Sequence, residues 1–159
     1  MRGVATVLDA DREIAQALLG LMPLMGRLAH GVARERGTLT FERSRILWPL
    51  VLGGPMRAGE LAQQCHLGRP TLTELVDGLV DEGLVRREED ANDRRAVVLT
   101  LTAHGRRELH RFETAIAAAL AEVVGRLEPS KRERLRATLA DLHRAFRAQT
   151  EAQEAANVR

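Results

Sequence analysis

Two short helical segments joined by a tight turn restrict the fold of this 159-residue chain more than any other feature. Residues 58–64 form the first segment, and residues 70–81 form the second. The second segment repeats apolar residues at the spacing of one helical face: Leu72, Leu75, Val76, Leu79 and Val80. A few residues, among them His66-Leu67-Gly68, separate the two segments. This arrangement predicts a helix-turn-helix.

The apolar period changes to two directly after Gly83. Residues 84–87 read as a strand, residues 90–93 are rich in turn formers, and residues 96–101 alternate as a second strand. A hairpin that follows a helix-turn-helix without a linker predicts a winged helix.

Helical patterns occupy both ends of the chain. Residues 1–37 predict one helix, kinked or split at Pro23 because proline lacks the backbone N–H. Thr40 is the expected N-cap of a helix that runs to Leu52. Thr102 is the expected cap of a long helix that extends to about Leu127, and a last helix begins at Pro129.

The expected fold class is therefore mainly α with a small β-hairpin wing (α+β), a winged helix-turn-helix joined to a helical lobe from both termini. Four parts are predicted: a dimerisation helix at 1–37, the winged helix-turn-helix at 38–102, dimerisation helices at 103–147 and a flexible tail at 148–159. The terminal helices carry more apolar surface than one small lobe covers, so we expect a homodimer. The residues expected in its interface are Ile14, Leu18, Leu135, Leu139, Leu142 and Phe146.

Composition narrows the class of protein. No apolar run reaches the length of a membrane span, the first residues do not resemble a secretory signal, and a single cysteine excludes an intramolecular disulfide. We therefore expect a cytoplasmic protein without a membrane partner. We find no phosphate-binding glycine loop, nucleophile elbow or metal-ligand spacing, so we expect no enzyme, no cofactor and no metal.

The winged helix suggests how this chain binds double-stranded DNA. The N-terminal end of the second helix of such a motif points at the bases of the major groove, and a hairpin tip reaches the minor groove. The helix end carries Arg69, Pro70, Thr71 and Thr73. The hairpin tip carries Asn92, Asp93, Arg94 and Arg95.

Two runs carry a resemblance to the MarR family of transcriptional regulators: EEDANDRRAVVLTLTAHG (88–105) and GGPMRAGELAQQCHLGRPTLTELVDGLVDEGLV (53–85). The resemblance implies an obligate homodimer that represses from a palindromic operator until a small ligand or thiol oxidation releases it. It adds Glu74 to the expected major-groove contacts and implies that Arg94 enters the minor groove beside Arg95 and Asn92. Asp93 is expected to shape the wing tip.

The sequence also suggests a ligand pocket, a candidate thiol sensor and an alternative function. The family geometry places Trp48 and Phe112 near the junction of the lobes, so with Met25 and Arg45 they are expected to line a ligand pocket. Cys65 is a candidate thiol sensor, although it lies on the apolar side of its helix, where a buried thiol is usually inert. A winged-helix module that binds protein in place of DNA is the alternative function.

Net charge does not by itself favour DNA. The chain has a formal charge of +2 and an isoelectric point of about 9.4. Residues 38–102, however, hold eight arginines and ten carboxylates, a formal charge of −2. DNA binding by this lobe must therefore rest on where the arginines are placed, and we expect few phosphate contacts.

Overall fold

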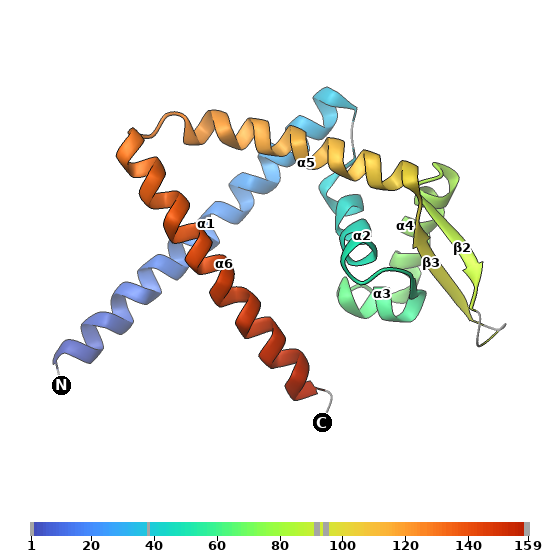
Figure 1. Cartoon of the computed structure of the whole chain (residues 1–159), viewed down its shortest axis with the longest axis horizontal. Coiled ribbons are helices and arrows are strands. Elements are labelled where there is room, and N and C mark those ends of the chain that lie inside the picture. Colours follow the sequence, from blue (N-terminus) through green and yellow to red (C-terminus); the bar gives the residue numbers. More distant parts are fainter. Residues whose placement is uncertain (1, 38, 91–92, 94–95, 158–159) are drawn as a thin grey trace. The chain divides into compact units, whose positions relative to one another are not determined.

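The computed structural model describes residues 2–37, 39–90, 93 and 96–157, and it is mainly helical with one small sheet (Figure 1). The elements are α1 (Arg2–Arg36), α2 (Phe41–Leu52), β1 (Met56–Arg57), α3 (Ala58–Gln64), α4 (Arg69–Asp81), β2 (Val85–Glu89), β3 (Val97–Leu101), α5 (Ala103–Val124) and α6 (Pro129–Asn157). The chain divides into two compact units, Met1–Ala117 and Ala118–Arg159. None of the helices in the described part of the chain is long and apolar enough to cross a membrane.

The helix boundaries follow local sequence signals. The Thr40 side chain accepts a hydrogen bond from the Arg43 amide at 3.3 Å, as expected of an N-cap. Gly83 follows α4 with φ of 69°, a backbone conformation that glycine adopts without the steric penalty of a side chain. The first helix is confirmed. Of the two outcomes expected at Pro23, a split is wrong, because α1 continues through the proline as one helix, and a kink stays a prediction.

The sheet contains three antiparallel strands in the order β1-β3-β2. Within the predicted hairpin, Val85 pairs with Leu101 and Glu89 pairs with Val97. The expectation of a two-stranded sheet was incomplete, because Met56 and Arg57 add a third strand against β3. Two residues are too few to show a period of two, so this strand left no pattern in the sequence.

One apolar core joins the helix-turn-helix, the sheet and the first half of α5. Its largest fully buried side chains come from α2, α3, α4, β3 and α5, and they include Ile46, Leu47, Leu61, Leu72, Leu79, Leu99 and Phe112. The core therefore fixes helix α4 from its inner side, while the other side of α4 stays in solvent.

The start of α5 is hydrogen-bonded to the short connection between α4 and β2. The Thr102 amide donates to the Leu84 carbonyl at 3.0 Å, and the Thr102 hydroxyl donates to the Gly83 carbonyl at 2.7 Å. The same hydroxyl accepts from the Gly105 amide at 2.9 Å, which confirms Thr102 as the cap. A Cβ atom on Gly105 would lie 2.1 Å from the Leu84 carbonyl oxygen, so this crossing requires glycine.

The second unit contains the end of α5 and all of α6. Here the structure differs from the flexible tail predicted for 148–159, because α6 continues as a helix to Asn157. The residues beyond Arg147 are mostly Ala, Gln and Glu, which have high helix propensity and need no apolar face to remain helical.

We expect Gly105→Ala to destabilise the protein by about 1–3 kcal/mol, because the new methyl group meets backbone that no rotamer change can move. Gly20→Ala is the matched control: nothing lies within 4 Å of its Cβ position, and alanine in a helix is more stable than glycine by about 0.5–1 kcal/mol. Urea unfolding at equal protein concentration measures both. Equal stability of the two variants would show that the crossing is not tight.

Candidate nucleic-acid interface

The recognition helix α4 separates its residues by burial. All five residues predicted to contact the major groove are exposed or partly exposed to solvent, and they occupy the first half of the helix: Arg69, Pro70, Thr71, Thr73 and Glu74. Leu72, Val76 and Leu79 are buried on the opposite side. The helix begins at Arg69, one residue before the predicted start. This arrangement can present the first turns of α4 to a base edge, and the contacts themselves stay predictions.

The chemistry of these side chains suits base reading. Thr73 donates its hydroxyl proton to the Arg69 carbonyl at 2.9 Å, so the oxygen lone pairs and the methyl group remain for a ligand. The Arg69 guanidinium makes no hydrogen bond or ion pair among the residues that the structure describes. It keeps its full set of donors for a guanine or a phosphate.

Among the described residues of this lobe, four of the five other arginines face carboxylates. The ion pairs are Arg43–Glu82 at 2.8 Å, Arg57–Asp90 at 2.8 Å, Arg86–Glu88 at 3.1 Å and Arg87–Asp77 at 2.5 Å. Arg45 donates to the Cys65 carbonyl at 3.2 Å. The positive charges of the four paired arginines are therefore compensated inside the lobe. Among residues 39–90, Arg69 is the arginine for which no hydrogen bond or ion pair is found.

The wing is the hairpin of β2 and β3. Two backbone hydrogen bonds close the turn between these strands. The Asp90 amide donates to the Ala96 carbonyl at 3.0 Å, and the Ala96 amide donates to the Asp93 carbonyl at 2.8 Å. Asp93 is exposed at this turn, and the shaping role expected of it stays a prediction. The predicted minor-groove residues Asn92, Arg94 and Arg95 lie outside the described residues.

An open cleft of about 270 Å³ lies between the recognition helix and the wing. Its lining comes from β1, α3, α4 and the start of β3, and it includes Arg57, Gly59, Arg69, Thr73, Ala96 and Val97. The helix and the base of the hairpin therefore share one hollowed surface.

Comparison with known proteins identifies this arrangement. The profile of the MarR family matches residues 39–97. The transcriptional regulator YcgE of Bacillus subtilis is 53% identical over 51 residues, which span 31% of this chain and only 33% of YcgE. The homoprotocatechuate degradative operon repressor of Escherichia coli is 29% identical over 101 residues, 64% of this chain and 68% of the repressor.

A solved structure agrees over most of the fold. A point mutant of MepR from S. aureus, bound to an oligodeoxyribonucleotide, has a TM-score of 0.62 at 19% identity, with 84% of this chain and 97% of that chain covered. The chain belongs to the MarR family of winged helix-turn-helix transcriptional regulators. Membership confirms the prediction of a regulator in place of an enzyme.

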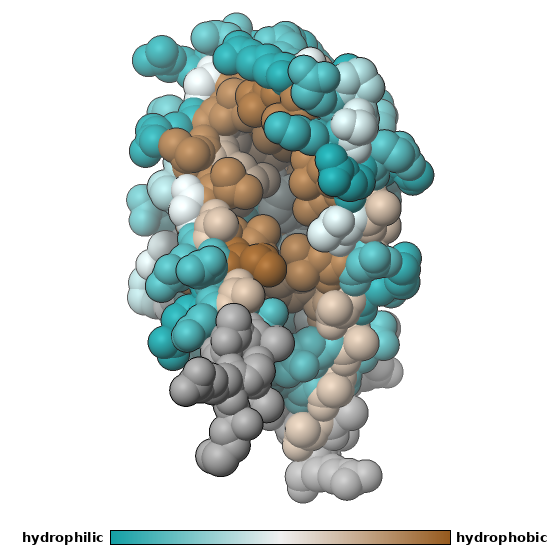
Figure 2. All heavy atoms as spheres, turned by 90° about the vertical axis from the view of Figure 1, so that its left-hand side faces the viewer, coloured by the Kyte–Doolittle hydropathy of each residue, from teal (hydrophilic) through white to brown (hydrophobic). Residues whose placement is uncertain are grey.

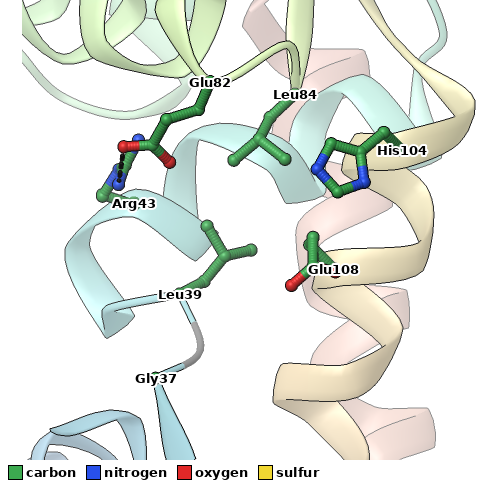
Figure 3. Close-up of a pocket in the computed structure, with 7 residues that line it drawn as sticks. All are labelled: Gly37, Leu39, Arg43, Glu82, Leu84, His104 and Glu108. Carbon is green, nitrogen blue, oxygen red and sulfur yellow. Dashed lines mark hydrogen bonds and ion pairs between the residues drawn. The ribbon is translucent and has the colours of Figure 1, made fainter.

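This MarR-family chain has a second opening, away from the wing tip. A cavity of about 460 Å³ lies where the α1–α2 connection, α2, the end of α4 and the first turns of α5 meet (Figure 3). Its lining residues are Gly37, Leu39, Arg43, Glu82, Leu84, His104 and Glu108. Sequence reasoning singled out none of them as pocket residues, because they come from four separate segments without a shared period.

Charged groups and buried leucines share the lining of this cavity. Arg43 and Glu82 form a two-armed ion pair, with Nη1 to Oε1 and Nη2 to Oε2 both at 2.8 Å. Leu39 and Leu84 are buried, with 5% and 2% of their surface exposed. Figure 3 shows His104 and Glu108 on α5, facing the opening from the side opposite Arg43.

The four residues predicted to line a ligand pocket lie elsewhere. Phe112 is a core residue with 2% exposure, and Met25 is 48% exposed on α1. Trp48 donates its indole N–H to Glu113 at 2.8 Å, and Arg45 is bonded to the Cys65 carbonyl. None of the four is among the residues that line the 460 Å³ cavity.

Cys65 sits in a setting that suppresses thiol chemistry. It is buried, and its Sγ lies 3.6 Å from the Arg45 carbonyl oxygen. Burial raises the pKa of the thiol, and the nearby Arg45 charge only partly opposes this. Because the thiolate is the reactive form, the geometry disfavours the sensor role. Among the described residues, no group of three or more His, Cys, Asp or Glu could hold a metal ion.

Apolar side chains remain exposed on the terminal helices. Of the predicted dimer residues, Ile14 is 60%, Leu139 49% and Phe146 62% exposed. Leu18, Leu135 and Leu142 are partly buried. Figure 2 shows hydrophobic side chains, in brown, open to solvent on the face toward the viewer. Exposed apolar surface on this scale is typical of interaction sites.

Proposed function

We propose that this MarR-family regulator is a homodimeric repressor that binds a palindromic DNA operator and is released by a small organic effector. The observation that carries the proposal is the recognition helix, whose inner side is fixed in the core while Arg69, Thr71 and Thr73 face solvent beside the wing. Such a surface matches the way winged helices enter the major groove.

Dimerisation supplies the geometry of the operator. The exposed leucines and phenylalanine of α1 and α6 need a cover, and a second copy of the chain provides one with the same composition. A two-fold axis would then set the two recognition helices about 34 Å apart, one turn of DNA, so each would meet half of a palindrome. Residues 1–37 and 103–147 are the proposed dimerisation segments.

The relatives support both parts of the proposal. MepR is similar in fold and its structure contains an oligodeoxyribonucleotide, and the Escherichia coli relative is named as an operon repressor. The proposal that the chain acts on chromosomal operators implies that it works in the cytoplasm.

The alternative function is a winged-helix module that binds protein. The formal charge of −2 over residues 38–102 and the internal ion pairs favour it, because a lobe with compensated arginines attracts DNA weakly. Selection of bound duplexes from a random pool separates the two functions, since only the repressor recovers a palindrome.

On the selected operator, we expect Arg69→Ala to weaken binding by about 1–3 kcal/mol and to relax selectivity at one base pair of each half-site. Glu151→Ala on α6 removes an exposed charge beyond the proposed dimerisation segments; it is the control and should leave affinity unchanged. Fluorescence anisotropy with labelled duplex measures both. Equal affinities for the two variants and the wild type would contradict a base contact by Arg69.

The 460 Å³ cavity is the proposed effector site, since its volume falls in the range typical of small-molecule pockets. His104→Trp should fill it, so an operator-controlled reporter should stay repressed when compounds that induce the wild type are added. His110→Trp is the control, an exposed position on the same helix that does not line this cavity. Normal induction of His104→Trp would place the effector elsewhere.

A further inference from the structure

Arg57 on strand β1 links this strand to Asp90, where β2 ends and the turn of the wing begins. Its Nε and Nη2 atoms both lie 2.8 Å from Oδ2 of Asp90, a residue 33 positions later in the chain. The Asp90 side chain is only 12% exposed, while the Arg57 side chain is 45% exposed. A two-armed contact to a mostly buried carboxylate holds both groups in one orientation.

The backbone on each side of this ion pair is also fixed. The Arg57 amide donates to Oε2 of Glu60 at 2.9 Å, and Arg57 pairs with Val98 in the sheet. On the wing, the Asp90 amide closes the hairpin by donating to the Ala96 carbonyl. The ion pair therefore connects β1, where α3 begins, to the point at which the wing tip emerges.

Carboxylates also decide what Arg57 is free to bind. Asp90, Asp93 and Glu60 all raise the pKa of Arg57, which places three negative charges around one guanidinium. The Arg57 guanidinium is therefore already engaged by carboxylates of its own chain. This contrasts with Arg69, on the other side of the same cleft, which makes no ion pair among the described residues.

We propose that Arg57 is a positioning residue that acts through Asp90 to hold the wing beside the recognition helix, and that it does not contact a DNA phosphate. The proposal rests on the DNA-binding function proposed above. It assigns a role to the short strand β1, whose two residues anchor the wing from the side of the helix-turn-helix.

The effect of Asp90→Asn discriminates a positioning role from a phosphate contact. If Arg57 positions the wing, Arg57→Ala and Asp90→Asn both weaken operator binding about fivefold to tenfold, without changing its salt dependence. If Arg57 instead binds phosphate, Arg57→Ala lowers the slope of log K against log salt by about one, and Asp90→Asn strengthens binding because it frees a cation. The second pattern would overturn the proposal.

Two further variants complete the test. The exchanged pair Arg57→Asp/Asp90→Arg should recover most of the operator affinity if the link between the two positions is what matters. Glu151→Ala, which breaks an ion pair within α6 beyond the proposed dimerisation segments, is the control and should match the wild type. Failure of the exchanged pair together with an altered salt slope would count against positioning.

A measurement without DNA separates failure of this inference from failure of the proposed function. Amide hydrogen exchange at Asp90 and Ala96 reports opening of the wing turn, since the Asp90 amide donates to the Ala96 carbonyl across the hairpin and the Ala96 amide donates to the Asp93 carbonyl within the turn. We expect exchange to be several-fold faster in Arg57→Ala than in the wild type, because the variant loses the ion pair that holds Asp90. Unchanged exchange would refute the clamp even if the protein binds its operator as proposed.

Discussion

The rest of the fold depends on one constraint: the start of α5 crosses Gly83 and Leu84, the residues that lead from α4 to β2. Thr102 bonds to the carbonyl groups of Gly83 and Leu84, and Gly105 lets the helix backbone pass where a Cβ would collide with Leu84. The end of α4, the start of the wing and the start of α5 are thereby one junction. Further along α5, Leu109 and Phe112 enter the same core.

If the 460 Å³ cavity is the effector site, as proposed above, that junction is the physical route from effector to DNA. Leu84 and His104 line the 460 Å³ cavity, and both belong to or adjoin the crossing. A ligand there shifts the recognition helix only as far as it binds one arrangement of the junction better than another, because differential affinity limits any population shift. The Arg43–Glu82 ion pair joins α2 to the end of α4, and both of its residues line the same cavity.

Much of the fold was predictable because it rests on local signals. The bounds of α3 and β3, the Thr40 and Thr102 caps and the glycine after α4 follow from period, capping chemistry and backbone freedom. The missed features are non-local or patternless: β1 is two residues long, and the Arg57–Asp90 pair joins distant segments. The helix of residues 148–157 was not predicted, because helix propensity without an apolar face has the composition of a flexible tail. For the candidate site, amphipathic spacing indicates which side of α4 faces solvent. The expected pocket residues rest on the family resemblance, and burial of Phe112 in the core is not visible in the sequence. Which arginines are compensated was not visible in the sequence, because ion pairing depends on where β2, α4 and β1 meet.

The central claim is that a few placed arginines, and not general basicity, bind the operator. The salt dependence of wild-type binding tests it most directly, measured by anisotropy on the selected palindrome between about 50 and 200 mM salt. The account predicts a slope of log K against log salt shallower than about −5, which corresponds to fewer than about six phosphate contacts for the dimer. A slope near about −10, as in binders that neutralise many phosphates, would contradict it.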